Sequence, residues 1–228
     1  MNIIITGASR GIGRDLAIQF AQNPANRLLV LSRNEVRLKE LADQYRNIEY
    51  LKYDLGRPDT DALLEAIKDW EKLDILVNNA GLLIKKPFAE LSQSDWQRSF
   101  DVNFFGPVEL TKLCLPLLRN SDQGHILNIT SMGGFQGSSK FPGLASYSAS
   151  KAALGNLTEC LAEELKEEGI SVNALALGAV QTEMLAEAFP GFEPPMHSDQ
   201  MARFIADFAV SGRQFFNGKV LPVSTSTP

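Results

Sequence analysis

The fold is decided by the stretch Thr6-Gly7-Ala8-Ser9-Arg10-Gly11-Ile12-Gly13, which joins an apolar run to an amphipathic segment. The preceding run, Asn2–Thr6, is typical of a buried strand, and Gly11–Gln22 has the period of a helix. Glycine permits a tight turn and a close approach to the backbone, while the amides and dipole at a helix start attract anions. Such turns also occur for purely steric reasons, so it is the position in a β-α-β unit that favours a pyrophosphate site.

Outward from this turn, short apolar runs alternate with longer segments of helical period along the whole chain. Strands are expected at Asn2–Thr6, Arg27–Ser32, Ile48–Lys52, Asp74–Asn78, His125–Thr130, Ser171–Ala176 and Lys219–Val223, and helices at Gly11–Gln22, Glu35–Tyr45, Asp59–Trp70, Ser92–Leu118, Ser146–Glu168 and Ser198–Val210. This alternation predicts an α/β fold, a Rossmann-like doubly wound parallel sheet of about seven strands with helices on both faces. Ligands bind such sheets beyond the carboxyl ends of the strands.

The bulk composition is that of one globular domain, residues 1–228, because no linker or repeat divides the chain. The net charge is -5 and the basic residues are scattered, which argues against a nucleic-acid surface. The apolar runs are too short to cross a bilayer and no cleavable leader is expected, so a cytoplasmic location is predicted. His125 and His197 lack companion ligands, so no metal is expected, and Cys114 and Cys160 are interpreted as small apolar packing residues.

Charged residues near the glycine turn bear on the choice of dinucleotide. Where an NAD-specific protein carries an acidic residue, the second strand ends in Ser32-Arg33, and Arg10 lies in the turn itself. A guanidinium pairs with the extra phosphate of NADP, which a carboxylate would repel, so NADP(H) is favoured over NAD(H). Two solvated surface arginines are the alternative. Asp54, which precedes Leu55 after the third strand, is interpreted either as an acceptor for the adenine amino group or as a turn former.

Three side chains are candidates for proton transfer. Tyr147 and Lys151 are four residues apart on a predicted helix and so share a face, where a cation lowers the pKa of a phenol towards a useful range. A merely packed or solvated pair is the alternative. Ser131 follows the fifth strand, where its hydroxyl is placed to orient a carbonyl, although Thr130 is a second candidate and serine is also a common turn former.

Taken in order, Asn78-Asn79-Ala80-Gly81, Asn103, Ser131 and Tyr147 to Lys151 resemble the motifs of the short-chain dehydrogenase/reductases from Met1 to about Thr182. The resemblance implies hydride transfer between a nicotinamide and a carbonyl or alcohol carbon, with Tyr147 as general acid/base and Ser131 orienting the substrate. It also implies that Lys151 holds the nicotinamide ribose and that Asn103 retains a water near it; a satisfied buried amide is the alternative for Asn103. The implied cofactor residues are Gly7, Ser9, Arg10, Gly11, Ile12, Gly13, Arg33, Asp54, Leu55, Asn79, Ala80, Gly81, Tyr147, Lys151, Gly178 and Thr182.

The chain departs from the family pattern at its substrate end. Leu177 replaces a usual proline, which predicts a more mobile loop, and the Ser131–Tyr147 segment is a few residues longer than usual. A lid is expected near residues 178–197. Candidate substrate-facing residues are apolar, and each has a core position as its alternative: Leu82, Leu83, Met132, Phe135, Phe141, Met184, Leu185 and Phe189.

The resulting expectation is an NADP(H)-dependent carbonyl reductase or alcohol dehydrogenase acting on a small apolar substrate, assembled as a homodimer or homotetramer. The tail Ser224–Pro228 lacks the Asp-Gly-Gly ending of many relatives, which leaves an interface there open. A regulatory or signalling protein that binds NADP with little turnover is the alternative, because a fold does not fix a function.

Overall fold

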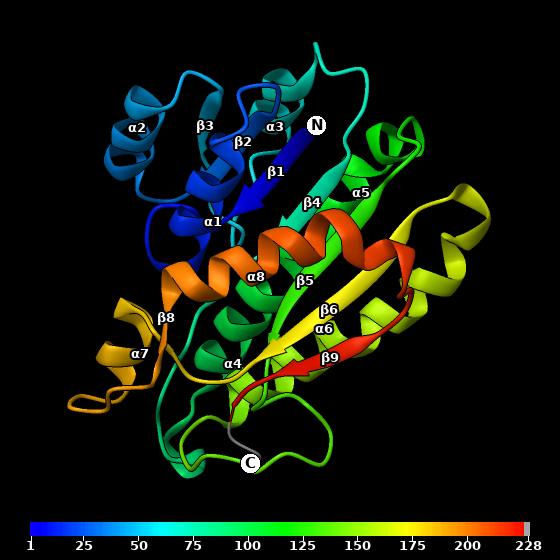
Figure 1. Cartoon of the computed structure of the whole chain (residues 1–228). Coiled ribbons are helices and arrows are strands. Elements are labelled where there is room, and N and C mark those ends of the chain that lie inside the picture. Colours follow the sequence, from blue (N-terminus) through cyan, green and yellow to red (C-terminus); the bar gives the residue numbers. More distant parts are fainter. Residues whose placement is uncertain (226–228) are drawn as a thin grey trace.

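A computed structural model describes residues 1–225 and contains a seven-stranded, all-parallel sheet in the order β3-β2-β1-β4-β5-β6-β9 (Figure 1). The strands are β1 (Asn2–Thr6), β2 (Arg27–Ser32), β3 (Ile48–Lys52), β4 (Ile75–Asn78), β5 (His125–Ser131), β6 (Ser171–Leu177) and β9 (Val220–Val223). The predicted Rossmann-like doubly wound fold is therefore confirmed. Of the tail discussed above, residues 226–228 lie outside the described part of the chain.

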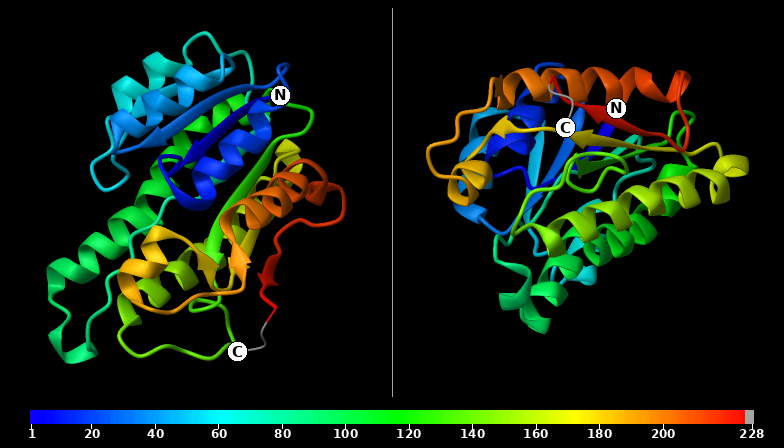
Figure 2. Two further views of the ribbon diagram at one scale, coloured as in Figure 1. Left: turned by 60° about the vertical axis from the view of Figure 1, so that its left-hand side comes forward. Right: turned by 90° about the horizontal axis from the view of Figure 1, so that it is seen from below.

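Helices cover both faces of the sheet, as the two further views show (Figure 2). One face carries α1 (Gly11–Ala21), α2 (Glu35–Gln44) and α8 (Ser198–Ser211), and the other carries α3 (Thr60–Ile67), α5 (Gly106–Arg119) and α6 (Ala145–Glu164). Successive strand residues point to opposite faces, so Ile3 and Ile5 enter the first core and Ile4 the second. This two-sided burial is why the strands are apolar throughout.

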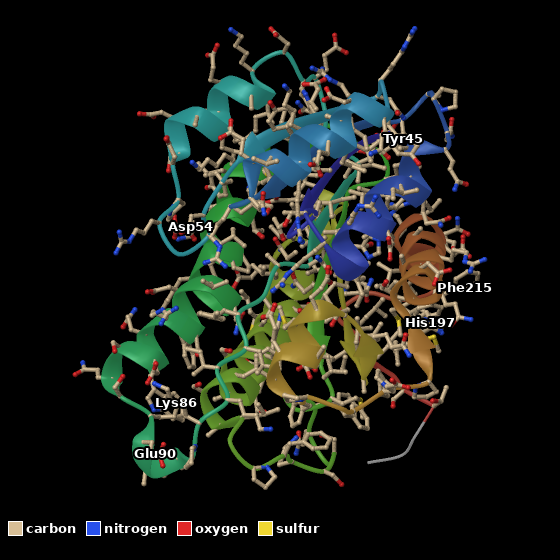
Figure 3. The ribbon with its side chains drawn as sticks, turned by 90° about the vertical axis from the view of Figure 1, so that its left-hand side faces the viewer. Tyr45, Asp54, Lys86, Glu90, His197 and Phe215 are labelled. Atoms are coloured by element: carbon tan, nitrogen blue, oxygen red, sulfur yellow. The ribbon has the colours of Figure 1, made fainter. Side chains whose placement is uncertain are left out.

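The order of the strands creates the crevice in which such folds bind ligands. β1 pairs with β2 on one side and with β4 on the other, so the chain leaves the sheet in opposite directions on either side of this point. Residues that follow the strands, among them Arg33, Asp54, Asn79 and Ser131, therefore gather at one edge of the sheet. Figure 3 shows Asp54 on the loop after β3.

The predicted helix Ser92–Leu118 is wrong in its middle. The structure has α4 (Gln93–Phe100), then the π-helix η2 (Asp101–Phe105), then α5, with the Gly106 amide donating to the Asp101 carbonyl. A π-turn changes the backbone hydrogen bonding without interrupting the apolar period, so the sequence pattern does not reveal it. The predicted helix Ser146–Glu168 similarly ends as α6 followed by the short η3 (Lys166–Glu168).

The predicted lid contains regular structure: β7 (Val180–Gln181), α7 (Glu183–Ala188) and β8 (Met196–His197), with β7 and β8 paired in parallel. Two further 3₁₀ turns, η1 (Phe88–Glu90) and η4 (Gly212–Gln214), are also outside the predicted elements. Leu177, expected to begin a mobile loop, is instead the last residue of β6 and pairs with Ser131 and Val223. Its own backbone thus belongs to the sheet.

Candidate active site

The glycine turn is held tightly against the sheet. Gly7 has a φ of 71° and its amide donates to the Leu31 carbonyl at 2.7 Å. A Cβ at Gly13 would lie 2.4 Å from both the Gly7 carbonyl oxygen and Nδ2 of Asn79, so only glycine fits there. Arg10, at the N-cap of α1, makes no side-chain cap hydrogen bond. The first amides of α1 are therefore left for an anion.

The end of β4 supports this turn from below. The Asn79 and Ala80 amides donate to Thr6 Oγ1 at 3.0 and 2.9 Å, and Asn79 Nδ2 donates to the Thr6 carbonyl at 2.9 Å. The neighbouring Asn78 side chain donates to Asn128 Oδ1 at 2.8 Å inside the sheet. These hydrogen bonds from the Asn78–Gly81 segment thus fix the position of the glycine turn relative to the end of β4.

The arginines are positioned differently from each other. Arg10 forms an ion pair with Glu187 of α7, with Nη1 2.6 Å from Oε1, while Arg33 is exposed at the end of β2. Arg37, which the sequence analysis overlooked, has Nη1 3.9 Å from Oε1 of Glu183. Its signal is its place one helical turn beyond Arg33, at the start of α2. The alternative of a solvated surface arginine therefore fits Arg33, but it does not fit Arg10, which is paired with a carboxylate.

Asp54 behaves in part as the turn former that the sequence allowed. Its Oδ1 accepts a hydrogen bond from the Gly56 amide at 2.9 Å, closing the turn after β3. Asp54 and Leu55 nevertheless line the same cavity as the glycine turn. Both interpretations of Asp54 are consistent with this placement.

The strand β5 and the helix α6 bring Ser131, Tyr147 and Lys151 together. Lys151 is 3% exposed, and its Nζ donates to the Ile129 carbonyl at 2.7 Å. Burial lowers the pKa of Lys151 to about 8, because the charged form loses its hydration. Nζ also lies 3.5 Å from where a Cβ on Gly81 would be, so the lysine reaches beneath the end of the Asn78–Gly81 segment.

The pKa of Tyr147 is raised above its ordinary value by desolvation, and a hydrogen bond with the Ser131 side chain opposes this rise. The expected lowering of the Tyr147 pKa by Lys151 is outweighed in this structure by desolvation of the phenol, and the Lys151 ammonium donates to the Ile129 carbonyl. The buried phenol is consequently kept protonated, which suits a proton donor.

The choice between Ser131 and Thr130 follows from the alternation of side chains in β5. Thr130 is buried and its hydroxyl donates to the Leu175 carbonyl of the neighbouring strand at 3.3 Å. Ser131 reaches Tyr147, and its Oγ accepts from the Gly133 amide at 3.1 Å. Ser131 is therefore the hydroxyl that meets the candidate proton donor.

Asn103 sits in the π-helix η2 and is completely buried. Its Oδ1 accepts from the Leu82 amide at 2.7 Å, and its Nδ2 donates to the Leu82 carbonyl and to Ser150 Oγ, both at 2.9 Å. The side chain is thus a satisfied buried amide that ties η2 to α6. Because π-turns occur frequently at functional sites, its position remains consistent with a site role.

The glycine turn, Asp54, Asn79, Ser131, Tyr147 and Lys151 all line one cavity of about 600 Å³, within the range of small-molecule sites, whereas Asn103 does not. Every residue implied as a cofactor contact lines it, from Arg33 at one end to Tyr147 at the other. Of the apolar candidates, six line the cavity, and Leu82 and Phe135 do not: the six are Leu83, Met132, Phe141, Met184, Leu185 and Phe189. The continuous cavity and the uncapped amides of the glycine turn fit a dinucleotide.

Gly178 and Thr182 both lie where the resemblance placed them, but their contacts are within the protein. A Cβ on Gly178 would lie 2.5 Å from Oγ of Ser224, and the Gly178 amide donates to the Val223 carbonyl at 2.9 Å. Thr182 is the N-cap of α7, accepting from the Leu185 amide at 3.3 Å. Both residues therefore set how the lid leaves the sheet.

Other features test the compositional expectations. Within residues 1–225, no group of three or more histidine, cysteine or acidic side chains is arranged to hold a metal ion. No helix in this part of the chain combines the length and apolar character that a membrane crossing needs. Cys114 is buried, as expected of a packing residue, whereas Cys160 is exposed on α6, so the packing interpretation is wrong for Cys160.

The sheet order, the glycine turn and the cavity define a dinucleotide-binding protein of the Rossmann type. Within that class, residues 1–191 match the short chain dehydrogenase family, and the chain belongs to this family of oxidoreductases. An uncharacterized oxidoreductase of Staphylococcus epidermidis is 34% identical over 184 residues, covering 79% of this chain and 78% of the relative.

Two solved structures resemble the whole described fold. The 3-ketoacyl-(acyl-carrier-protein) reductase from Brucella melitensis, complexed with NADH, superposes with a TM-score of 0.87 at 27% identity, covering 97% of this chain and 96% of that one. ElxO with NADP bound gives a TM-score of 0.84 at 28% identity, with the same coverage of the two chains. Similar folds of this family thus hold either dinucleotide.

Proposed function

We propose that this protein is an NADP(H)-dependent oxidoreductase that interconverts a carbonyl and an alcohol on a small apolar substrate, with Tyr147 as general acid/base. The observation that carries the proposal is the meeting of Ser131, Tyr147 and Lys151 in the cavity that the glycine turn also lines. When bound, NADPH would supply the hydride in the direction of reduction. The proton for the carbonyl oxygen has to come from the protein.

Each side chain has a role that its environment supports. The raised pKa of Tyr147 keeps its phenol protonated, so this residue would donate the proton to the carbonyl oxygen during reduction. Ser131, already hydrogen-bonded to Tyr147, orients that oxygen. After this transfer Lys151, whose pKa of about 8 keeps it largely charged near neutral pH, would stabilise the Tyr147 phenolate until it regains a proton from solvent. Asn103 positions the Leu82 backbone and α6 around them.

For the cofactor, the amides of Gly11 to Gly13 would bind the pyrophosphate, and Arg10 and Arg33 the additional phosphate of NADP(H). Lys151 would hold the nicotinamide ribose. The apolar residues Leu83, Met184 and Phe189 line the part of the cavity nearest the lid and favour an apolar substrate. By analogy with the family, a homodimer or homotetramer and a cytoplasmic location are part of the same proposal.

The test is a titration of the purified protein with NADPH and NADH, followed by nicotinamide fluorescence, and then a panel of ketones and aldehydes with the tighter cofactor. We expect tighter binding of NADPH and its oxidation by an apolar carbonyl compound. Tyr147→Phe should abolish turnover and retain NADPH binding, because it removes one hydroxyl. Turnover by Tyr147→Phe at the wild-type rate would exclude the proposed proton donor.

A further inference from the structure

The lid helix α7 lies against the turn that is proposed to bind phosphate. Thr182 Cγ2 is 3.2 Å, and Glu183 Oε2 is 3.6 Å, from the point where a Cβ of Gly11 would be. Figure 1 shows α7 below the start of α1, a helix that is far from it in the sequence. A helix bearing carboxylates therefore covers a surface built for anions.

The contact with Arg10 is specific in its geometry. Its Nη1 and Nη2 donate to the two carboxylate oxygens of Glu187 at 2.6 and 3.5 Å, so both oxygens occupy one edge of the guanidinium. This pairing lowers the pKa of Glu187 below its usual range. Arg10 lines the cofactor cavity, and it is the residue expected to meet the 2′-phosphate of NADP(H). The Arg10 guanidinium is thus paired with the Glu187 carboxylate although it is also the group expected to bind the 2′-phosphate.

The residues directly after Glu187, at the C-terminal end of α7 (Glu183–Ala188), are held by a separate partner. Lys85 Nζ donates to the Ala188 carbonyl at 2.9 Å and lies 3.9 Å from the centre of the Phe189 ring. These contacts do not involve the glycine turn. Losing the Arg10–Glu187 pair would therefore remove one contact between α7 and the glycine turn, while Lys85 at Ala188 and Arg37 at Glu183 still hold the helix.

We infer that Glu187 is a specificity-determining residue, which the 2′-phosphate of NADP(H) must displace from Arg10 before it can bind. The inference rests on the proposed function. A phosphate at Arg10 repels the Glu187 carboxylate, so binding of NADP(H) and release of α7 from the turn are coupled. NAD(H), which has no 2′-phosphate, leaves the pair intact. Glu187 thus reduces the preference for NADP(H) that the arginines create.

The decisive variant is Glu187→Gln, which removes the charge and keeps the shape. Exposed ion pairs contribute little, so we expect NADPH to bind about two- to five-fold more tightly and NADH with unchanged affinity. Adenosine 2′,5′-bisphosphate should follow NADPH, and 5′-AMP should follow NADH. Glu193→Gln is the matched control, since Glu193 is an exposed acid of the same lid with no ion pair among the described residues. It should leave all four affinities unchanged.

Two further measurements separate competition from a general charge effect. In an Arg10→Ala background, Glu187→Gln should no longer change the affinity for NADPH, as a double-mutant cycle requires. Amide hydrogen exchange in α7 should be faster with adenosine 2′,5′-bisphosphate than with 5′-AMP, and Glu187→Gln should abolish this difference.

The results that overturn the inference are distinct from those that overturn the function. Wild-type NADPH affinity in Glu187→Gln, or equal tightening of NADPH and NADH, would show that Glu187 does not compete for Arg10. If the wild-type protein and every variant bind neither dinucleotide, the proposed function fails as well.

Discussion

The pH dependence of stability is expected to depend on His125, which is completely buried at the start of β5. Burial lowers the pKa of His125 to about 4, with a smaller contribution from the charge of Arg213. Its Nδ1 is 2.8 Å from the Ala209 carbonyl, so this nitrogen carries the proton and donates. Its Nε2 is 3.2 Å from Nδ2 of Asn173. Nε2 must therefore accept.

The Asn173 amide cannot rotate to receive a proton from Nε2. Its Oδ1 accepts from the Lys219 amide at 3.1 Å, and its Nδ2 also donates to the Phe216 carbonyl at 2.9 Å. Protonation of His125 would consequently place a donor against a donor in a site without water access. The hydrogen-bond network of β5, β6 and the chain entering β9 thus specifies the neutral imidazole.

The sign and size of the effect follow from linkage. The unfolded chain binds a proton at His125 below a pKa of about 6.5, whereas the folded chain does so only below about 4, so stability falls as the pH decreases through this window. Each pH unit costs up to about 1.4 kcal/mol, and the whole interval about 3 kcal/mol.

Urea unfolding of the wild type and of His125→Gln, at several pH values between 7 and 4, measures this loss. The variant has its own cost at pH 7, but the difference between the two proteins should shrink by about 3 kcal/mol on acidification. His197→Gln retains His125 and should show the full loss. Figure 3 shows His197 on the surface beside α8. A difference between wild type and His125→Gln that is constant with pH would refute the reasoning.

Two other substitutions test the scaffold of the site. Gly13→Ala should lower the free energy of unfolding, measured in urea, by about 1–3 kcal/mol, because its Cβ would lie 2.4 Å from backbone and from Asn79. The control Gly155→Ala, whose Cβ meets Val220 only at 3.8 Å, should be neutral or stabilising. Equal effects of the two substitutions would contradict the close approach at Gly13. Asn103→Asp keeps an acceptor for the Leu82 amide but loses both donated bonds, so its urea midpoint should fall, and an unchanged midpoint would count against the network.

Much of the fold could be predicted because its signals are local. Ile3, Ile4 and Ile5 are apolar on both faces of a strand, and glycine at positions 7 and 13 is required by backbone approaches under 3 Å. The cavity-lining residues were predictable for the same reason, since the carboxyl ends of parallel strands meet at one edge. That Tyr147 and Lys151 share one face of a helix was predictable from their spacing. The loss of hydration that shifts the pKa of each side chain was not, because it depends on how the folded chain covers them.

The features that the sequence did not indicate depend on the assembled structure. The π-turn at Asn103 leaves the apolar period of the surrounding helices intact, so periodicity carries no trace of it. The short helix α7 is stabilised by a threonine cap and by partners about 100 residues or more away, Arg10 and Lys85. Arg37 of α2 comes within ion-pair distance of Glu183 in α7 although the two residues are far apart in the sequence. Such contacts exist only once the chain has folded.

The scaffold and the lid are held by different forces, and they should respond differently to the solution. The strands and the helices α1, α5 and α8 bury continuous apolar surface, which salt does not screen. The lid helix α7 is attached to the turn through the ion pair of Arg10 and to α2 through that of Arg37, and both pairs are partly exposed. Because salt screens exposed charges, ionic strength should alter the position of α7 and the competition at Arg10 well before it alters the fold. If the 2′-phosphate binds Arg10 as proposed, it uses the same charge, so its affinity should fall with ionic strength together with the attachment of the lid.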